Sequence, residues 1–236
     1  MIIGRDVFVD LVKFMDERKN DPTLGFAHAP LRWAHHHESN AVHDRDMSVN
    51  ELGDWNRSYK TPRTITWKGI PWICRREWFL DKENGLGGYG ALSERRISWG
   101  GGDMHIGTKP WLLGYKNWAV PTNAAIHIGP FPNINRKSDN STHITETFNN
   151  YNYRLYSNSG NFPHTFGFLV SCYVLGGEKM MSRNKKMISE RFGRYINIDK
   201  WWFKAMEVGQ GEKAWLDERK IMTFEQLLER RPWDET

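Results

Sequence analysis

Apolar residues recur at helical spacing near the start of the chain. Between Asp6 and Lys19 they are Val7, Val9, Leu11, Val12, Phe14 and Met15. This spacing predicts an amphipathic helix that begins at Asp6, a residue type common at N-caps. Pro22 ends the pattern, and the apolar segment Thr23–Ala29 that follows predicts a first strand.

Further predicted elements alternate with long polar stretches. Residues 30–63 and 130–163 are polar and weakly periodic, which predicts loops. Between them the pattern predicts a strand over Thr64–Trp72, a helix over Arg75–Lys82, a glycine-rich turn over Asn84–Gly90, a helix over Asp103–Leu113, and a strand over Trp118–Ile128 broken by Pro121.

The C-terminal part of the chain is predicted to be helical. One helix is expected within His164–Arg191 and one or two more within 197–231, where Thr223 and Gln226 form a capping box. These elements predict an α/β fold with a mixed, incomplete sheet and C-terminal helices. We expect a catalytic domain over residues 1–163 and a helical extension over residues 164–236.

Composition indicates which class of partner and which cellular compartment to expect. The 236 residues carry a net charge of +5, which favours an anionic partner such as a nucleic acid or a sugar nucleotide. No apolar run approaches the roughly 18 residues that span a bilayer, so no membrane partner is expected. Cys74 and Cys172 lie far apart within apolar runs, and we predict reduced core residues in a cytoplasmic protein.

The stretch Trp99-Gly100-Gly101-Gly102-Asp103 is the strongest candidate for chemistry. Glycines let the backbone approach a ligand where a Cβ would clash. Asp103 precedes the apolar residues Met104, Ile106, Trp111 and Leu112, which are expected to bury one helix face. A carboxylate held there can accept a proton from an attacking hydroxyl. The alternative interpretation is that Asp103 is only the N-cap of this helix.

Neighbouring motifs extend this stretch into an ordered set: Arg75-Arg76-Glu77-Trp78-Phe79, Gly87-Gly88-Tyr89, Leu112-Leu113-Gly114-Tyr115 and Ile126-His127-Ile128-Gly129. The order resembles the acceptor-side half of GT-A-type glycosyltransferases, including the polypeptide N-acetylgalactosaminyltransferase-like and the bacterial and phage family 2-like enzymes. The resemblance spans residues 64–131. It implies a GT-A-like mixed sheet and an enzyme that moves a sugar from a nucleotide-sugar donor to a hydroxyl acceptor.

The resemblance also implies roles for individual residues. Asp103 would be the catalytic base or would anchor the acceptor. Trp99, Gly100, Gly101, Gly102 and Trp72 would bind the acceptor. A Mn²⁺ or Mg²⁺ ion would offset charge on the leaving diphosphate, with His127, Asp44 and Asp46 as candidate ligands.

Two departures from the family pattern leave alternatives open. Gly102 stands where the family usually has an acid, and the N-terminal nucleotide-binding β-α-β half is apparently lacking. The chain could therefore be a non-catalytic carbohydrate- or nucleic-acid-binding relative, or one subunit of a split glycosyltransferase. We expect a homo-oligomer that pairs through an exposed edge at Thr23–Ala29, or a partner chain that supplies the donor half.

Two further questions stay open at this point. The acceptor could be a nucleic acid, a saccharide or a polypeptide. A weaker third hypothesis is a metal-dependent hydrolase, in which the histidine-rich stretch 35–46 would have to converge with His127 or His143.

Overall fold

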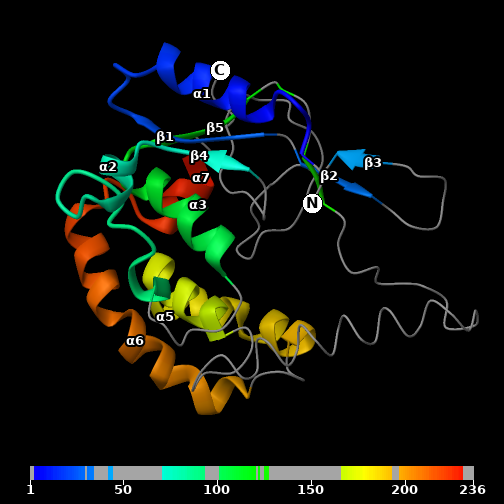
Figure 1. Cartoon of the computed structure of the whole chain (residues 1–236). Coiled ribbons are helices and arrows are strands. Elements are labelled where there is room, and N and C mark those ends of the chain that lie inside the picture. Colours follow the sequence, from blue (N-terminus) through cyan, green and yellow to red (C-terminus); the bar gives the residue numbers. More distant parts are fainter. Residues whose placement is uncertain are drawn as a thin grey trace, which may run out of the picture.

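The computed structural model describes residues 3–29, 31–34, 42–44, 71–93, 101–120, 122, 125–127, 166–192 and 197–230. This part of the chain holds six α-helices, one short 3₁₀ helix and two three-stranded sheets. The predicted mixed α/β class is confirmed. Figure 1 shows a helix above one small sheet and the remaining helices below it.

The first helix, α1 (Val7–Glu17), forms where the apolar spacing predicted it. Its buried residues are Val7, Leu11, Phe14 and Met15, and positions i, i+4, i+7 and i+8 lie on one face of a helix. This stripe packs against β1 (Leu24–His28), the strand predicted next. The helix therefore forms because a single apolar face can be buried on the sheet.

The first sheet has β1 at its centre, in the order β4–β1–β5. β1 pairs antiparallel with β4 (Trp72–Ile73) and parallel with β5 (Lys116–Ala119). All five β1 residues are buried, as expected for a strand that is covered on both faces. The prediction that Thr23–Ala29 forms an exposed sheet edge is wrong, because β1 has a hydrogen-bonded neighbour on either side.

Two short helices cover the face of this sheet opposite α1. They are α2 (Arg76–Leu80) and α3 (Gly102–Leu112), both at predicted positions. Phe26 of β1 is fully buried between them and packs edge-on against Trp72 and Trp78, with ring centroids 4.9 and 5.1 Å away. Figure 1 shows the sheet between α1 above and α3 below.

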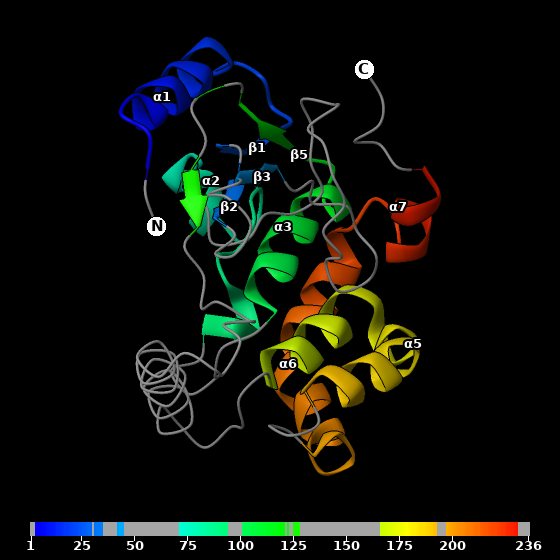
Figure 2. The ribbon, with the colours of Figure 1, turned by 90° about the vertical axis from the view of Figure 1, so that its right-hand side faces the viewer.

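Three C-terminal helices pack around α3: α5 (Phe166–Phe192), α6 (Ile198–Arg219) and α7 (Phe224–Arg230). Figure 2 shows α3 between the strands and the α5–α6 pair. The apolar core of these helices includes Trp111 and Leu112 of α3. The division into domains at residues 163 and 164 falls outside the described residues and stays a prediction.

The capping box predicted before α7 is present. The Thr223 N–H donates to Oε1 of Gln226 at 2.8 Å, and the Gln226 N–H donates to Oγ1 of Thr223 at 3.1 Å. This reciprocal pair satisfies two backbone donors at the helix start. The predicted capping box therefore lies at the start of α7.

A second sheet was not predicted. It consists of β3 (Val42–Asp44), β2 (Leu31–Ala34) and β6 (Ala125–His127), in that order. β2 and β3 fall within residues 30–63, so the loop prediction is wrong there. The strand predicted over Trp118–Ile128 is divided between the two sheets. Strands of three or four residues contain too few alternations to give a periodic signal.

Cys74 and Cys172 do not form a disulfide bond with each other, as predicted. Cys172 of α5 is fully buried, and burial raises the pKa of the Cys74 thiol to about 12. Neither environment favours the reactive thiolate. In the described ranges, no helix combines the length and the apolar character needed to cross a bilayer.

Stability should depend on pH through His28, which is fully buried in β1. Burial lowers the pKa of its imidazole to about 4, although the Nδ1 contact with the Ala29 carbonyl at 3.0 Å opposes this. As the pH falls from 6.5 toward 4, the unfolded chain binds a proton that the folded chain does not bind. The free energy of unfolding should therefore fall by up to about 3 kcal/mol in this window.

The measurement compares urea unfolding of the wild type and His28→Gln at about pH 7.5 and about pH 4.5. The variant should lose less stability between the two pH values than the wild type does. An equal loss in both proteins would show that His28 is not responsible.

Candidate functional site

The start of α3 is fixed by a glycine in the left-handed conformation. Gly101, at the N-cap, has φ 78° and ψ −10°. A Cβ there would lie 2.6 Å from both the Gly167 carbonyl oxygen and Oγ of Ser171 in α5. The Ser171 hydroxyl also donates to the Gly101 carbonyl oxygen at 3.2 Å. The helix start therefore lies directly against α5, at a distance that only glycine permits.

The residue after the N-cap is less crowded. Among the described residues, no atom lies within 4 Å of the position that a Cβ on Gly102 would take. Asp103 follows as the second residue of α3, in the first turn, where the helix dipole favours a negative charge. Because Gly101 is the N-cap, the interpretation of Asp103 as the N-cap is wrong. The backbone thus places residue 103 in the first turn of α3, one residue after Gly102.

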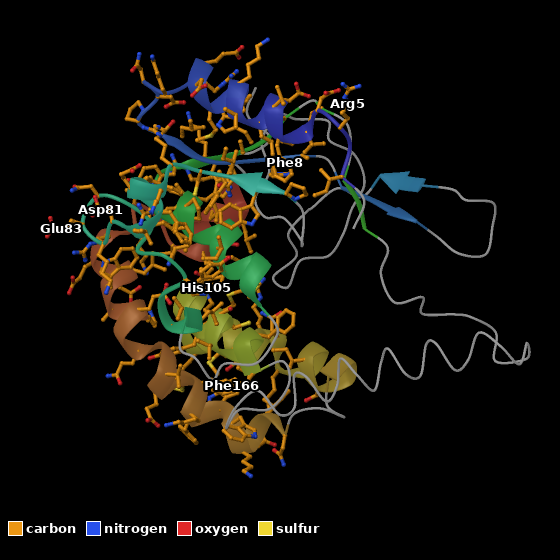
Figure 3. All side chains as sticks on the ribbon, in the orientation of Figure 1. Arg5, Phe8, Asp81, Glu83, His105 and Phe166 are labelled. Carbon is orange, nitrogen blue, oxygen red and sulfur yellow. The ribbon has the colours of Figure 1, made fainter. Side chains whose placement is uncertain are left out.

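A buried cluster of charged groups lies one turn further along α3. Nζ of Lys109 donates to Oε1 of Glu212 in α6 at 2.6 Å, and Nε2 of His105 lies 2.9 Å from the same oxygen. The side chains of His105 and Lys109 are fully buried, and that of Glu212 is 6% exposed. Figure 3 labels His105, which belongs to α3. We call Lys109, His105 and Glu212 the buried triad.

The glycine turn is part of this arrangement. Nζ of Lys109 also donates to the Gly88 carbonyl oxygen at 2.8 Å, and the Ala91 N–H donates to Oε2 of Glu212 at 2.6 Å. Ala91 belongs to η1 (Gly90–Ser93), the 3₁₀ helix that follows the turn. Gly90 has φ 52°, and a Cβ on it would lie 2.0 Å from the Glu212 carboxylate. Glycine at this position therefore lets the carboxylate reach the backbone.

The electrostatics of the triad keep Glu212 ionised. Burial alone would raise the pKa of its carboxyl, but the charges and hydrogen bonds of His105 and Lys109 outweigh burial and lower this pKa to about 2. An ionised carboxylate only accepts hydrogen bonds, so Nε2 of His105 carries the hydrogen that it donates to Glu212. Burial lowers the pKa of Lys109, and the Glu212 carboxylate opposes that change.

Trp72, a predicted acceptor-binding residue, lies in an aromatic cluster. It is half-buried on β4, its ring centroid is 4.9 Å from that of Phe26, and its ring is tilted against Phe79 at 6.0 Å. Phe79 in turn contacts the ring of Tyr89, which is 42% exposed, at 5.6 Å. This packing gives Trp72 a structural role, and its role in acceptor binding stays a prediction.

Some of the segments within the span of the glycosyltransferase resemblance contact one another, whereas Ile126 and His127 belong to β6 of the second sheet. Besides the bond from Lys109 to Gly88, the Tyr115 hydroxyl donates to the carbonyl oxygen of Asn84 in the glycine-rich turn at 2.6 Å. Nδ2 of Asn117 in β5 donates to the Gly107 carbonyl oxygen of α3 at 2.6 Å. The glycine turn, α3 and β5 therefore form one connected unit.

The predicted metal ligands are only partly described. His127 in β6 lies opposite Trp33 of β2, and Asp44 in β3 lies opposite Arg32 of the same strand. The two candidate ligands thus belong to the outer strands of one sheet, with β2 between them. Asp46 lies outside the described residues, as do Trp99 and Gly100 of the predicted acceptor site.

The sequence did not predict the buried triad. α3 was expected to bury one apolar face, but His105, Thr108 and Lys109 are fully buried together with Ile106 and Leu112. A lysine in a helix that is buried on all sides requires a nearby anion. The sequence indicated neither the burial of Lys109 nor the identity of its anion, since Glu212 is 103 residues away from Lys109.

Comparison with known proteins gives no assignment: neither a family model nor a curated protein matches the chain.

Proposed function

We propose that this protein is a cytoplasmic glycosyltransferase that moves a sugar from a nucleotide-sugar donor to a hydroxyl acceptor. One observation carries the proposal. The glycine turn, α3 and β5, which lie within the span of the resemblance, form a connected unit, and Asp103 is the second residue of α3 in that unit.

In the proposed reaction, Asp103 removes the proton from the acceptor hydroxyl. The hydroxyl oxygen then forms a bond to the anomeric carbon of the donor sugar, and the bond from that carbon to the nucleoside diphosphate breaks. In a retaining variant of the chemistry, Asp103 would instead hold the acceptor. Trp99 and Gly100–Gly102 would form the wall of the acceptor pocket.

A divalent cation belongs to this proposal. Asp44, Asp46 and His127 offer carboxylate oxygens and an imidazole nitrogen, a donor set that suits Mn²⁺ and, through the carboxylates, Mg²⁺. When bound, the ion would neutralise charge on the leaving diphosphate.

Calorimetric titration with a panel of nucleotide sugars, with and without Mn²⁺, tests the proposal. Metal-dependent binding of one donor would support a self-contained enzyme. If a folded protein binds no donor in the panel, the self-contained enzyme is excluded. A non-catalytic relative or a split enzyme with a second chain would then take its place.

Asp103→Asn is expected to lower the rate of transfer by about 10²–10⁴-fold, because the amide cannot accept the proton. The folded state should be unaffected, since the change is isosteric. The measurement is release of nucleoside diphosphate in the presence of the acceptor. Asp16→Asn makes the same change at an exposed site on α1 and should leave the rate unchanged. Wild-type turnover by Asp103→Asn would remove Asp103 from the reaction.

A further inference from the structure

One carboxylate of α6 joins η1 and α3, although Ala91 and Lys109 lie 121 and 103 residues before it in the sequence. Glu212 of α6 accepts hydrogen bonds from Ala91 in η1 and from His105 and Lys109 in α3. Lys109 extends the connection to the carbonyl oxygen of Gly88. All three carboxylate bonds are between 2.6 and 2.9 Å long. Charge-assisted bonds of this length are among the stronger ones in proteins.

The connection ends close to Asp103. The His105 N–H donates to the Gly101 carbonyl oxygen at 2.8 Å, which closes the first turn of α3 around Gly102 and Asp103. The side chain of His105 is bonded to Glu212, and its other ring nitrogen, Nδ1, is buried with no partner among the described residues. In the described structure, Glu212 is therefore the group that orients this ring.

Residues of both η1 and α6 allow the Glu212 carboxylate to come close to the backbone. Gly90 leaves the space that a Cβ would take, since that atom would be 2.0 Å from the carboxylate. The ring of Trp215, one turn further along α6, has the Lys109 ammonium 5.5 Å from its centroid, and its Nε1 donates to the Lys82 carbonyl oxygen at 2.8 Å. The same part of α6 thus also contacts the segment just before the glycine turn.

We infer that Glu212 is a positioning residue for the proposed acceptor site: it locks the glycine turn and the first turn of α3 into the arrangement that presents Asp103. The expected effect of Glu212 on catalysis rests on the proposed function. It makes α6 part of the site, although the sequence suggested an appended helix.

The test uses the full chain with two variants of the carboxylate and one of its neighbour. Glu212→Gln keeps the shape but removes the charge, Glu212→Asp keeps the charge on a shorter side chain, and Gly90→Ala pushes the carboxylate away. The matched control is Glu207→Gln, the same change in the same helix at a side chain that is 66% exposed.

The first readout is backbone hydrogen exchange, which requires no substrate. Glu212→Gln should raise exchange in residues 87–93 and 101–106 by at least about tenfold and leave α1 and β1 unchanged, because the opening is local. Glu207→Gln should change neither region. An equal rise over the whole chain would overturn the inference, since it would show only a loss of global stability. Unchanged hydrogen exchange at residues 87–93 and 101–106 in Glu212→Gln would also overturn the inference.

The second readout is transfer per folded molecule, at a temperature where every variant is folded. Displacement of Asp103 should lower kcat by about 10–100-fold while the KM for the donor stays near the wild-type value. Glu212→Asp should recover part of this loss. If Glu212→Gln does not fold, Glu212→Asp and Gly90→Ala give the same comparison.

The two proposals fail in different ways. A wild type without transfer activity would refute the proposed function, and hydrogen exchange alone would then decide whether Glu212 holds the two segments together. A folded Glu212→Gln variant with wild-type kcat would refute the positioning role and leave the proposed function intact.

Discussion

Lys109→Met is expected to lower the free energy of unfolding by about 3–5 kcal/mol, because it leaves the buried carboxylate of Glu212 without its ammonium partner. The separation of 2.6 Å between Nζ and Oε1 and the burial of both side chains make solvent a poor replacement. His105 and Ala91 would still donate to Glu212, but the positive charge of Lys109 would be lost. Denaturant unfolding of both proteins measures the difference.

A double variant separates the cost of an unpaired charge from the value of the pair. Lys109→Met combined with Glu212→Gln removes both charges, and we expect it to recover most of the lost stability. Lys213→Met is the control, because its ion pair with Asp217 is at the surface, where such a pair contributes less than about 1 kcal/mol. A cost below about 1 kcal/mol for Lys109→Met would mean that the triad is not an effective ion pair.

The elements that the sequence predicted correctly are those whose signal is local. α1 has its apolar stripe within one stretch of chain, and the capping box before α7 needs only Thr223 and Gln226. α3 was predicted to within one residue because glycines precede it and apolar residues recur along it. In each case the residues that decide the structure are near neighbours in sequence.

The parts that were missed depend on distant partners. β2 pairs with β6, and their registered residues Leu31 and Ala125 are separated by most of the first half of the chain. Glu212 is another example, since nothing in the segment Gly209–Lys213 indicates that its carboxylate will be buried against α3. Short strands and buried ion pairs depend on tertiary contacts. Hydrophobic periodicity along the chain gives no information about these contacts.

The candidate site also combines local features that the sequence predicted with distant contacts that it did not predict. The sequence predicted Asp103 near the N-terminus of a helix, and the structure has it there as the second residue of α3. It did not predict that α5 and α6 hold this helix through Ser171 and Glu212. The residues that could perform chemistry were visible in the sequence, and the groups that hold them in place were not.

Gly101→Ala is expected to destabilise the protein by about 3 kcal/mol or more, through two effects that add. The left-handed conformation at φ 78° costs an L-residue about 1–2 kcal/mol. The new Cβ would also lie 2.6 Å from the Gly167 carbonyl oxygen, which belongs to the backbone of α5 and has little freedom to move. Thermal or denaturant unfolding measures the loss of stability. The start of α3 should also move away from α5.

The neighbouring glycine provides the matched control. Gly102→Ala introduces the same methyl group one residue later, inside the helix, where no atom of the described residues lies within 4 Å. It should be neutral or stabilise the protein by up to about 1 kcal/mol, because alanine is the better helix former. If both variants lose the same stability, the contact between Gly101 and α5 is not what fixes the start of α3. If only Gly101→Ala loses stability and also loses transfer activity, the position of Asp103 depends on that contact.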